Sequence, residues 1–352
     1  MASSTTPTSA EAAGAADALV ALRKFPQLER LRGLPSDRAR ELYARGMNNA
    51  RAFWVLNRRY VEGLHRHAAP ELTPPARRVA GDLAVNGIAF ANFAEFYPPS
   101  FFDTISARFY HYLEEFQHTA PPSAAEGKGV FLDTVHKAHT FTVGDPVSTY
   151  LAEPAFAAIA ADYMGMVPRF VGSSFWRTRV ATGTDRLYSQ LWHRDYNDRM
   201  LVKVFLYLTD VGPKEGYFEY VAGSHERGAL GPEFDRIGPD GFRAYPDGPT
   251  VERRLADLPS FDLSATHEAA RFGSTAPWHG VPAVVRCPAP RGTLIIADSF
   301  GLHRGGFVEE GHRDMVMTTY STNFNVHKPH FSVTRGFADT LTPFMRMSFG
   351  AS

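Results

Sequence analysis

The sequence predicts a mainly β protein with flanking helices, built around an antiparallel jelly-roll barrel. Several apolar stretches of strand length lie in the second half of the chain, at 170–180, 204–210, 293–297 and 315–320. Turn residues separate these stretches, and most segments with helical periodicity lie ahead of them. A succession of short strands with helices gathered before it is typical of a jelly-roll barrel that helices cover.

Length and composition bound the class of protein. The 352 residues suffice for one large or two ordinary domains, and 44% hydrophobic with 21% charged residues is ordinary for a soluble globular protein. Lys plus Arg equals Asp plus Glu, 37 of each, so nothing indicates a nucleic-acid or anionic-membrane partner. No apolar run approaches the ~18 residues that a membrane-spanning helix needs. The single Cys287 excludes an internal disulfide and fits a cytoplasmic protein.

The N-terminal region is expected to differ from the barrel. Residues 1–16 lack the basic start and apolar core of a secretion signal and are predicted to be a disordered tail. Residues 17–75 show an amphipathic helical pattern that ends in a proline-rich linker. We expect a helical extension packed on the main domain, or else a homodimer interface. The main domain is expected over 76–335, and a C-terminal segment over 336–352.

One strand and two helices are expected between the linker and the barrel. Residues 85–93 read as the strand, and a helix follows from Ser100. One face of this helix is apolar at helical spacing: Phe102, Ile105, Phe109, Leu113 and Phe116. The second helix is expected over 150–164 and should end before Pro168.

Two later regions are candidates for binding a substrate. Residues 226–290 are charged and rich in Gly and Pro, so we expect a long loop that acts as a lid or binding element. Trp278 lies near its end. On the strand at 170–180, Arg177 and Arg179 share one face, and that face points either to the site or to solvent.

The strongest chemical signal is a His-x-Asp motif at His193 and Asp195. Residues two apart on a strand point to the same face. With one further His they complete the 2-His-1-carboxylate set typical of non-haem iron(II) oxygenases. His303, which follows another predicted strand, is the candidate third ligand. His136 and His139 are expected to be structural, because residues three apart on a strand face opposite sides.

The motif alone is weak, because the same tripeptide returns at His312-Arg313-Asp314. His-Arg-Asp also occurs in the catalytic loop of protein kinases, but that loop needs an Asn five residues after the Asp, and position 200 is Met. Two alternatives stay open: a jelly-roll protein that binds a metal or ligand without turnover, and a non-redox metal isomerase on the same fold.

The segment around the first motif resembles the phytanoyl-CoA dioxygenase-like family of iron(II)/2-oxoglutarate oxygenases. The shared features are a Trp before the His-x-Asp, an apolar strand after it, and a Gly-Ser-His run that ends at His225. The resemblance covers roughly residues 80–325 and implies a double-stranded β-helix core. Arg194 stands where the family commonly has Gln, and Ala222 where it commonly has Pro. Both departures bear on the substrate rather than on the metal.

The resemblance implies an enzyme that uses iron(II), 2-oxoglutarate and dioxygen to hydroxylate a small molecule. In the family an Arg about ten residues beyond the second His binds the distal carboxylate of 2-oxoglutarate, and Arg313 is ten beyond His303. Arg304 competes for this role. Lys203 and Phe205 are further 2-oxoglutarate candidates, although Lys203 could equally face solvent. Candidate contacts to the substrate or its lid are Arg194, Trp278, Arg177 and Arg304.

Overall fold

The computed structural model describes residues 70–119, 127–181, 185–195, 198–234, 248–266, 271–322, 325 and 329–351. The predicted tail and nearly all of the predicted helical extension lie outside these residues, and so does the proposed homodimer interface. Within the described ranges, no helix combines the length and the apolar character that crossing a membrane requires.

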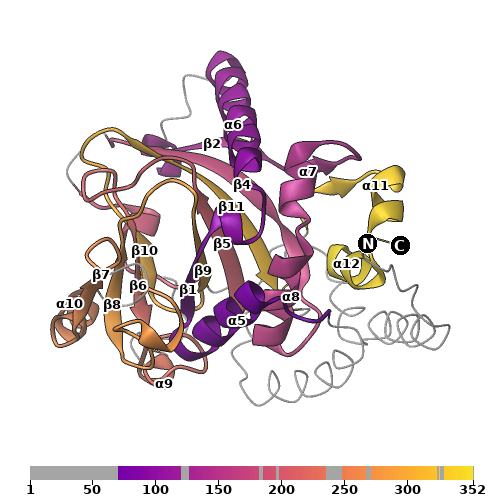
Figure 1. Ribbon diagram of the computed structural model, residues 1–352. Helices are drawn as coiled ribbons and strands as arrows, with labels where there is room; N and C mark the ends of the chain where they lie inside the picture. The colour runs from indigo at the N-terminus through magenta and orange to yellow at the C-terminus, as the bar shows by residue number, and fades with distance from the viewer. Residues whose placement is uncertain are drawn as a thin grey trace, which may run out of the picture.

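Two main sheets form the centre of the fold (Figure 1). The six-stranded sheet has the order β1-β9-β5-β11-β4-β2 and the four-stranded sheet the order β10-β6-β8-β7, antiparallel throughout except for the β7–β8 pair. Their strands are β1 Ile88–Asn92, β2 Leu132–Lys137, β4 Arg169–Arg179, β5 Leu201–Tyr207, β6 Phe218–Ala222, β7 Ser260–Asp262, β8 Ala283–Cys287, β9 Thr293–Asp298, β10 His303–Gly305 and β11 His312–Ser321. A small parallel pair joins β3 Thr140–Phe141 to β12 Ser332–Val333.

The connectivity of the strands is that of a jelly roll with eight segments. In chain order these are β4, the bridge residue His193, β5, β6, β8, β9, β10 and β11. The six-stranded sheet contains the sixth, third, eighth and first segments side by side. The other sheet contains the second, seventh, fourth and fifth, because His193 bridges to His303 in β10. The core is a double-stranded β-helix, as the sequence predicted.

Helices cover the outer face of the six-stranded sheet (Figure 1). The described helices are α5 Pro74–Asn86, α6 Pro99–Thr119, α7 Pro146–Leu151, α8 Pro154–Met164, α9 Gly231–Phe234, α10 Gly248–Ala256, α11 Arg335–Thr340 and α12 Pro343–Phe349. Apolar residues of α5, α6, α8 and α12 form one cluster with outward-facing strand residues such as Val204, Ile296 and Val316. The C-terminal segment therefore packs on the main domain rather than forming a separate unit.

Inward-facing residues of the two sheets form a second apolar cluster. It includes Phe205 and Ile295 from the larger sheet and Phe218 and Val285 from the smaller one. Cys287 is also fully buried there. Because strand side chains alternate between faces, one strand such as β5 supplies both clusters. The functional groups described below lie at one end of this inner layer.

Two expected boundaries were shifted by local capping. β1 begins only at Ile88, because Val85 is still in α5 and Gly87, with φ 76°, ends that helix. The helix expected over 150–164 is two helices, α7 and α8, and α8 ends at the left-handed Gly165 rather than at Pro168. The long helix α6 agrees with the prediction, with four of the five named apolar residues buried and Phe116 partly buried.

The loop expected over 226–290 is not a single loop. It contains α9, α10, β7 and β8, and β8 is a central strand of the smaller sheet. The prediction placed its end too late because the apolar run of β8 lies between Pro282 and Pro288 and was read as part of the Pro-rich region. The insertion between β6 and β8 ends before Ala283, and its role as a lid stays a prediction.

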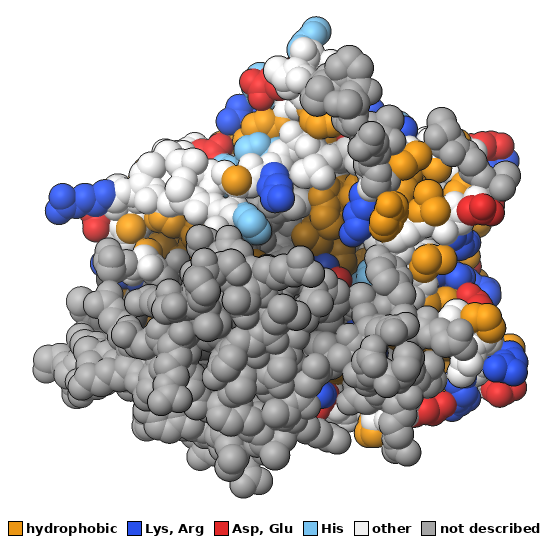
Figure 2. All heavy atoms as spheres, turned by 180° about the vertical axis from the view of Figure 1, so that it is seen from behind, with side chains coloured by type: hydrophobic (Ala, Val, Ile, Leu, Met, Phe, Trp, Pro, Cys, Tyr) orange, Lys and Arg blue, Asp and Glu red, His pale blue; other side chains and the backbone are white. Residues whose placement is uncertain are grey.

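Charges of both signs are interspersed over the described part of the face shown in Figure 2. This distribution agrees with the equal numbers of basic and acidic residues in the sequence.

Candidate metal and anion site

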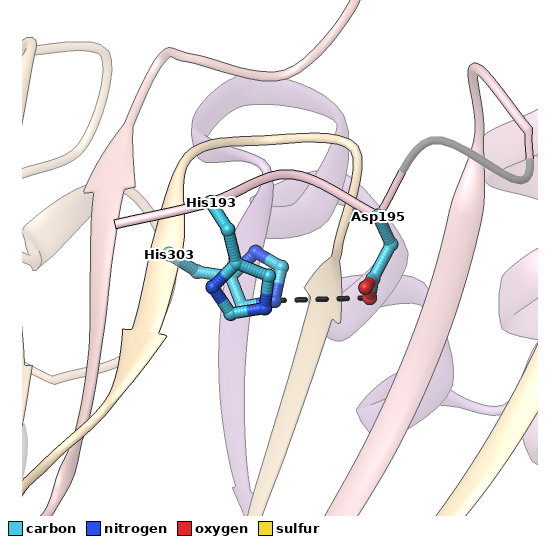
Figure 3. A group of neighbouring side chains, drawn as sticks. All are labelled: His193, Asp195 and His303. Atoms are coloured by element: carbon cyan, nitrogen blue, oxygen red, sulfur yellow. Dashed lines mark ion pairs between the residues drawn. The ribbon is translucent and has the colours of Figure 1, made fainter. Parts of the chain in front are cut away.

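His193 and His303 are brought together by backbone pairing. The amide N of His193 donates to the carbonyl O of His303 at 2.9 Å, and the amide N of His303 donates back at 3.0 Å. Directly opposed residues of an antiparallel pair project to the same side, and the two ring centroids lie 4.2 Å apart. Asp195 follows two residues later, fixed by its amide N to the carbonyl O of Ser299 at 2.9 Å. One ligand atom from each of the three side chains lies within 4.8 Å of the others (Figure 3).

Backbone carbonyls fix the orientation of both imidazoles. His193 Nδ1 lies 2.8 Å from the carbonyl O of Leu191, and His303 Nδ1 lies 2.9 Å from that of Gly301. A carbonyl oxygen only accepts, so each Nδ1 carries the proton and each Nε2 is the unprotonated ring nitrogen. His303 Nε2 points at Asp195, 3.7 Å from its Oδ2 (Figure 3). This tautomer is the one that a metal ion requires.

The protonation states of the three groups also suit a metal ion. Burial first, and neighbouring His193 second, lower the pKa of His303 to about 3. Burial likewise lowers the pKa of His193. Burial acts to raise the pKa of Asp195, but Lys203 and the two imidazoles outweigh it and hold that pKa below its usual range. Two neutral imidazoles and one carboxylate therefore face each other, a donor set that fits iron(II).

Lys203 points inward and contacts this group. Its Nζ lies 2.5 Å from Asp195 Oδ2. The sequence left the direction of this side chain open, and the register of β5 settles it, because Lys203 shares a face with Phe205 and both line the pocket.

The triad opens into a pocket between the two sheets. Its apolar lining consists of Phe131, Leu132, Trp176, Phe205, Phe218 and Met315. Besides the triad, its polar and charged lining consists of Lys128, Thr178, Ser189, Gln190, Lys203 and Arg313. The pocket thus combines an apolar wall with several separate polar groups, as ligand sites usually do.

Arg313 is a buried cation that faces this pocket. It is 6% exposed, and burial lowers its pKa. Nη2 donates to Thr178 Oγ1 at 3.4 Å, whereas Nε and Nη1 have no hydrogen-bond partner among the described residues. Thr178 is the residue opposite Arg313 in the register of β4 and β11. A buried guanidinium without a carboxylate is costly, so the position suits an anion supplied by a ligand.

Arg304 and Arg177 are bound to carboxylates of the protein instead. Arg304 Nε donates to Glu219 Oε2 at 2.5 Å, and its guanidinium lies 4.4 Å from the ring centroid of Trp192. Arg177 Nη2 donates to Asp314 Oδ2 at 2.6 Å. Neither arginine is among the described pocket-lining residues. Their predicted contact with substrate is not supported, because each side chain points to a different neighbour.

The two remaining substrate candidates are packed elsewhere. Trp278 is 1% exposed in the core between the sheets, with its ring centroid 5.7 Å from that of Phe90. Arg194 is buried, and its guanidinium lies 5.1 Å from the ring centroid of Phe300 and 5.9 Å from that of Phe234. Neither lines the pocket as the described residues define it.

His136 and His139 lie away from the pocket and contact each other. Their Nε2 and Nδ1 atoms are 3.2 Å apart. The prediction that they face opposite sides was wrong, because β2 ends at Lys137 and Ala138 turns the chain with φ 56°. His139 Nε2 also lies 2.9 Å from Ser148 Oγ, at the start of α7.

Several pocket residues were not found from the sequence. Lys128 and Gln190 lie on short 3₁₀ turns, where no periodicity indicates which way a side chain points. Trp176 and Thr178 could have been found, since they occupy the face of β4 opposite to Arg177 and alternate with it.

Comparison with known proteins gives similarity at the level of structure. No family model matches the sequence, and no curated protein matches it. The α-ketoglutarate-dependent epimerase SnoN from nogalamycin biosynthesis aligns with a TM-score of 0.43 and 16% identity, over 70% of this chain and 83% of its own. The carbocyclase SnoK from the same biosynthesis gives 0.45 and 14%, over 78% and 95%. EctD from S. alaskensis with bound iron gives 0.44 and 14%, over 76% and 85%. At these values the fold assignment rests on the strand order of this chain.

Proposed function

We propose that this chain is an iron(II)- and 2-oxoglutarate-dependent oxygenase that hydroxylates a small molecule. One observation carries the proposal: a three-residue metal-ligand set lines the same pocket as a buried arginine, which has no carboxylate partner among the described residues. The first feature fits a non-haem iron(II) ion, which binds two imidazoles and one carboxylate. The second fits a co-substrate that has a carboxylate at a distance from the metal.

In this proposal His193, Asp195 and His303 hold the iron ion through two Nε2 atoms and one carboxylate oxygen. The carbonyls of Leu191 and Gly301 keep both rings in the required orientation. When bound, iron(II) and 2-oxoglutarate supply an oxidation by dioxygen, in which one oxygen atom enters the substrate and the other enters succinate with release of CO2.

Arg313 binds the distal carboxylate of 2-oxoglutarate. Its Nε and Nη1 have no hydrogen-bond partner among the described residues and are available to donate to a carboxylate, while Thr178 accepts from Nη2. Phe205, which also lines the pocket, contributes apolar surface beside the co-substrate. Apolar walls of this kind keep water away from the ion pair and strengthen it.

Anaerobic reconstitution with iron(II) and 2-oxoglutarate tests the proposal. We expect one iron per chain, a visible absorption band that appears only when both are present, and succinate after dioxygen is admitted. Iron binding without succinate would favour a binding protein, and turnover without dioxygen would favour a metal isomerase. Product analysis with accepted substrates then separates hydroxylation from desaturation or rearrangement.

A further inference from the structure

The pocket carries more positive charge than the proposed iron and co-substrate account for. Among the described residues that line it, three are cationic: Lys128, Lys203 and Arg313. Asp195 is the only carboxylate in this described lining. A divalent ion and a dianionic co-substrate cancel each other, so this excess of two positive charges persists when both are bound. Cations that line one pocket are stabilised by anions, and the described lining residues supply one carboxylate, Asp195.

Lys203 and Arg313 line one pocket from different points along the sheet. In the register of β5 and β11, Lys203 is opposite Thr319, six residues along β11 from Arg313. At about 3.3 Å per residue, their Cα atoms are on the order of 20 Å apart along the sheet. Lys203 contacts Asp195, so it lies at the metal-ligand end. The distal carboxylate of 2-oxoglutarate, held by Arg313, therefore does not neutralise Lys203, and the charge of the other carboxylate is already counted against the metal ion.

Lys128 converges on the Lys203 end from a different element. It lies in the 3₁₀ turn Gly127–Val130, ahead of β2, and lines the same pocket. Burial and the neighbouring charge of Lys203 lower its pKa, and Asp195 is the one group with the opposite effect. Two ammonium groups from separate elements thus line the same pocket as one carboxylate. Asp195 cannot neutralise both of them and a metal ion as well.

We infer that the substrate carries an anionic group, a carboxylate, phosphate or sulfate, which binds between Lys128 and Lys203 beside the metal ligands. This inference rests on the proposed function, since it assigns the anion to a substrate of that site. Gln190 lies in the same lining, and its Nε2 has no hydrogen-bond partner among the described residues, so it is a further donor for this group. The apolar walls that include Trp176 and Phe218 suit an aromatic or aliphatic body attached to the anion.

Calorimetric titration of the protein loaded with manganese(II) and 2-oxoglutarate tests the inference, because manganese(II) replaces iron without turnover. The probes are benzoate, phenyl phosphate and phenyl sulfate, with neutral benzamide as the matched control. We expect at least one anionic probe to bind at least tenfold more tightly than benzamide. The three anions distinguish carboxylate from phosphate and sulfate recognition. Equal binding of all four probes would overturn the inference.

Substitution of a lysine tests whether the lysines cause the preference for anionic probes. Lys128→Gln should reduce the preference for the anionic probe at least fivefold without changing manganese(II) or 2-oxoglutarate affinity, since Lys128 is not a metal ligand. The matched control is Lys137→Gln, which removes an exposed lysine from β2. A preference unchanged in Lys128→Gln, or equally reduced in Lys137→Gln, contradicts the inference. Failure of the unsubstituted protein to bind manganese(II) or 2-oxoglutarate would instead contradict the proposed function.

Discussion

The tripeptide His-Arg-Asp occurs twice in this chain, and the two copies face in opposite directions. In the first copy, His193 and Asp195 point into the pocket, while Arg194 packs behind them near Phe300. In the second copy the arginine, Arg313, points into the same pocket. Its two neighbours turn outward, where Asp314 accepts two hydrogen bonds from Arg177 at 2.8 and 2.6 Å.

The difference shows that strand parity, and not the motif, decides the chemistry of these residues. Side chains alternate between the two faces along a strand. If the tripeptide is moved by one residue along the strand, the Arg faces the pocket in place of the His and the Asp. The first copy thereby offers a metal-ligand pair and the second a cation for an anionic ligand. The two copies complement each other because their strands lie in the two sheets that enclose one pocket.

The largest expected effect is loss of the metal ion. His193→Ala and His303→Ala should each weaken iron(II) binding by about a hundredfold or more, because two ligands remain where three are needed. His312→Ala is the matched control, since this histidine has the same sequence context and points away. Metal analysis of the purified variants measures the effect. Full iron occupancy in His193→Ala would mean that the first copy is not the metal site.

The second expected effect is on 2-oxoglutarate. Arg313→Ala leaves a carboxylate in a buried position without its cation, which costs roughly 2–5 kcal/mol. Since ~1.4 kcal/mol is tenfold, 2-oxoglutarate affinity should fall by at least ten- to hundredfold. Iron binding should be nearly unchanged. Titration of the anaerobic iron(II) protein, followed by its visible absorption, measures both.

Two other arginines sharpen this test. Arg304→Ala should leave 2-oxoglutarate affinity within about twofold, because Arg304 is held by Glu219. Arg194→Ala should likewise not affect it, although it removes packing against Phe300. If Arg304→Ala were the variant that loses 2-oxoglutarate affinity, Arg304 and not Arg313 would be the residue that binds the distal carboxylate.

Much of the fold could be predicted because period-2 and helical patterns are local properties of the sequence. The apolar strands and the buried face of α6 were found in this way. Boundaries were less accurate where a cap decides them, as Gly165 does for α8. The extent of the 226–290 region was misjudged because β8 is only five residues long, and its place in the core depends on pairing with β6, far from it in sequence.

The site was predicted where the argument depended on alternation, and missed where it depended on tertiary contacts. Alternation put the two residues of the first His-x-Asp on one face, as the structure has them. The direction of Lys203 could not be decided from sequence, because either face of β5 is apolar enough to be buried. Arg177 and Trp278 looked like ligand contacts only because their partners, Asp314 and the inter-sheet core, are distant in sequence.

The smallest expected effect concerns the outward side of the second copy. Asp314 is fully buried, and Asp314→Asn leaves the Arg177 guanidinium without its counter-charge, which should lower the free energy of unfolding by about 2–4 kcal/mol. Removing both charges in Asp314→Asn/Arg177→Met should restore part of that stability, since the Asn and Met side chains leave no unpaired charge. Denaturant unfolding measures this, and iron and 2-oxoglutarate affinities should stay unchanged in both variants. A loss of 2-oxoglutarate affinity that the double variant does not repair would show that Asp314 acts on the pocket through Arg313, and that the two faces of this strand are not independent.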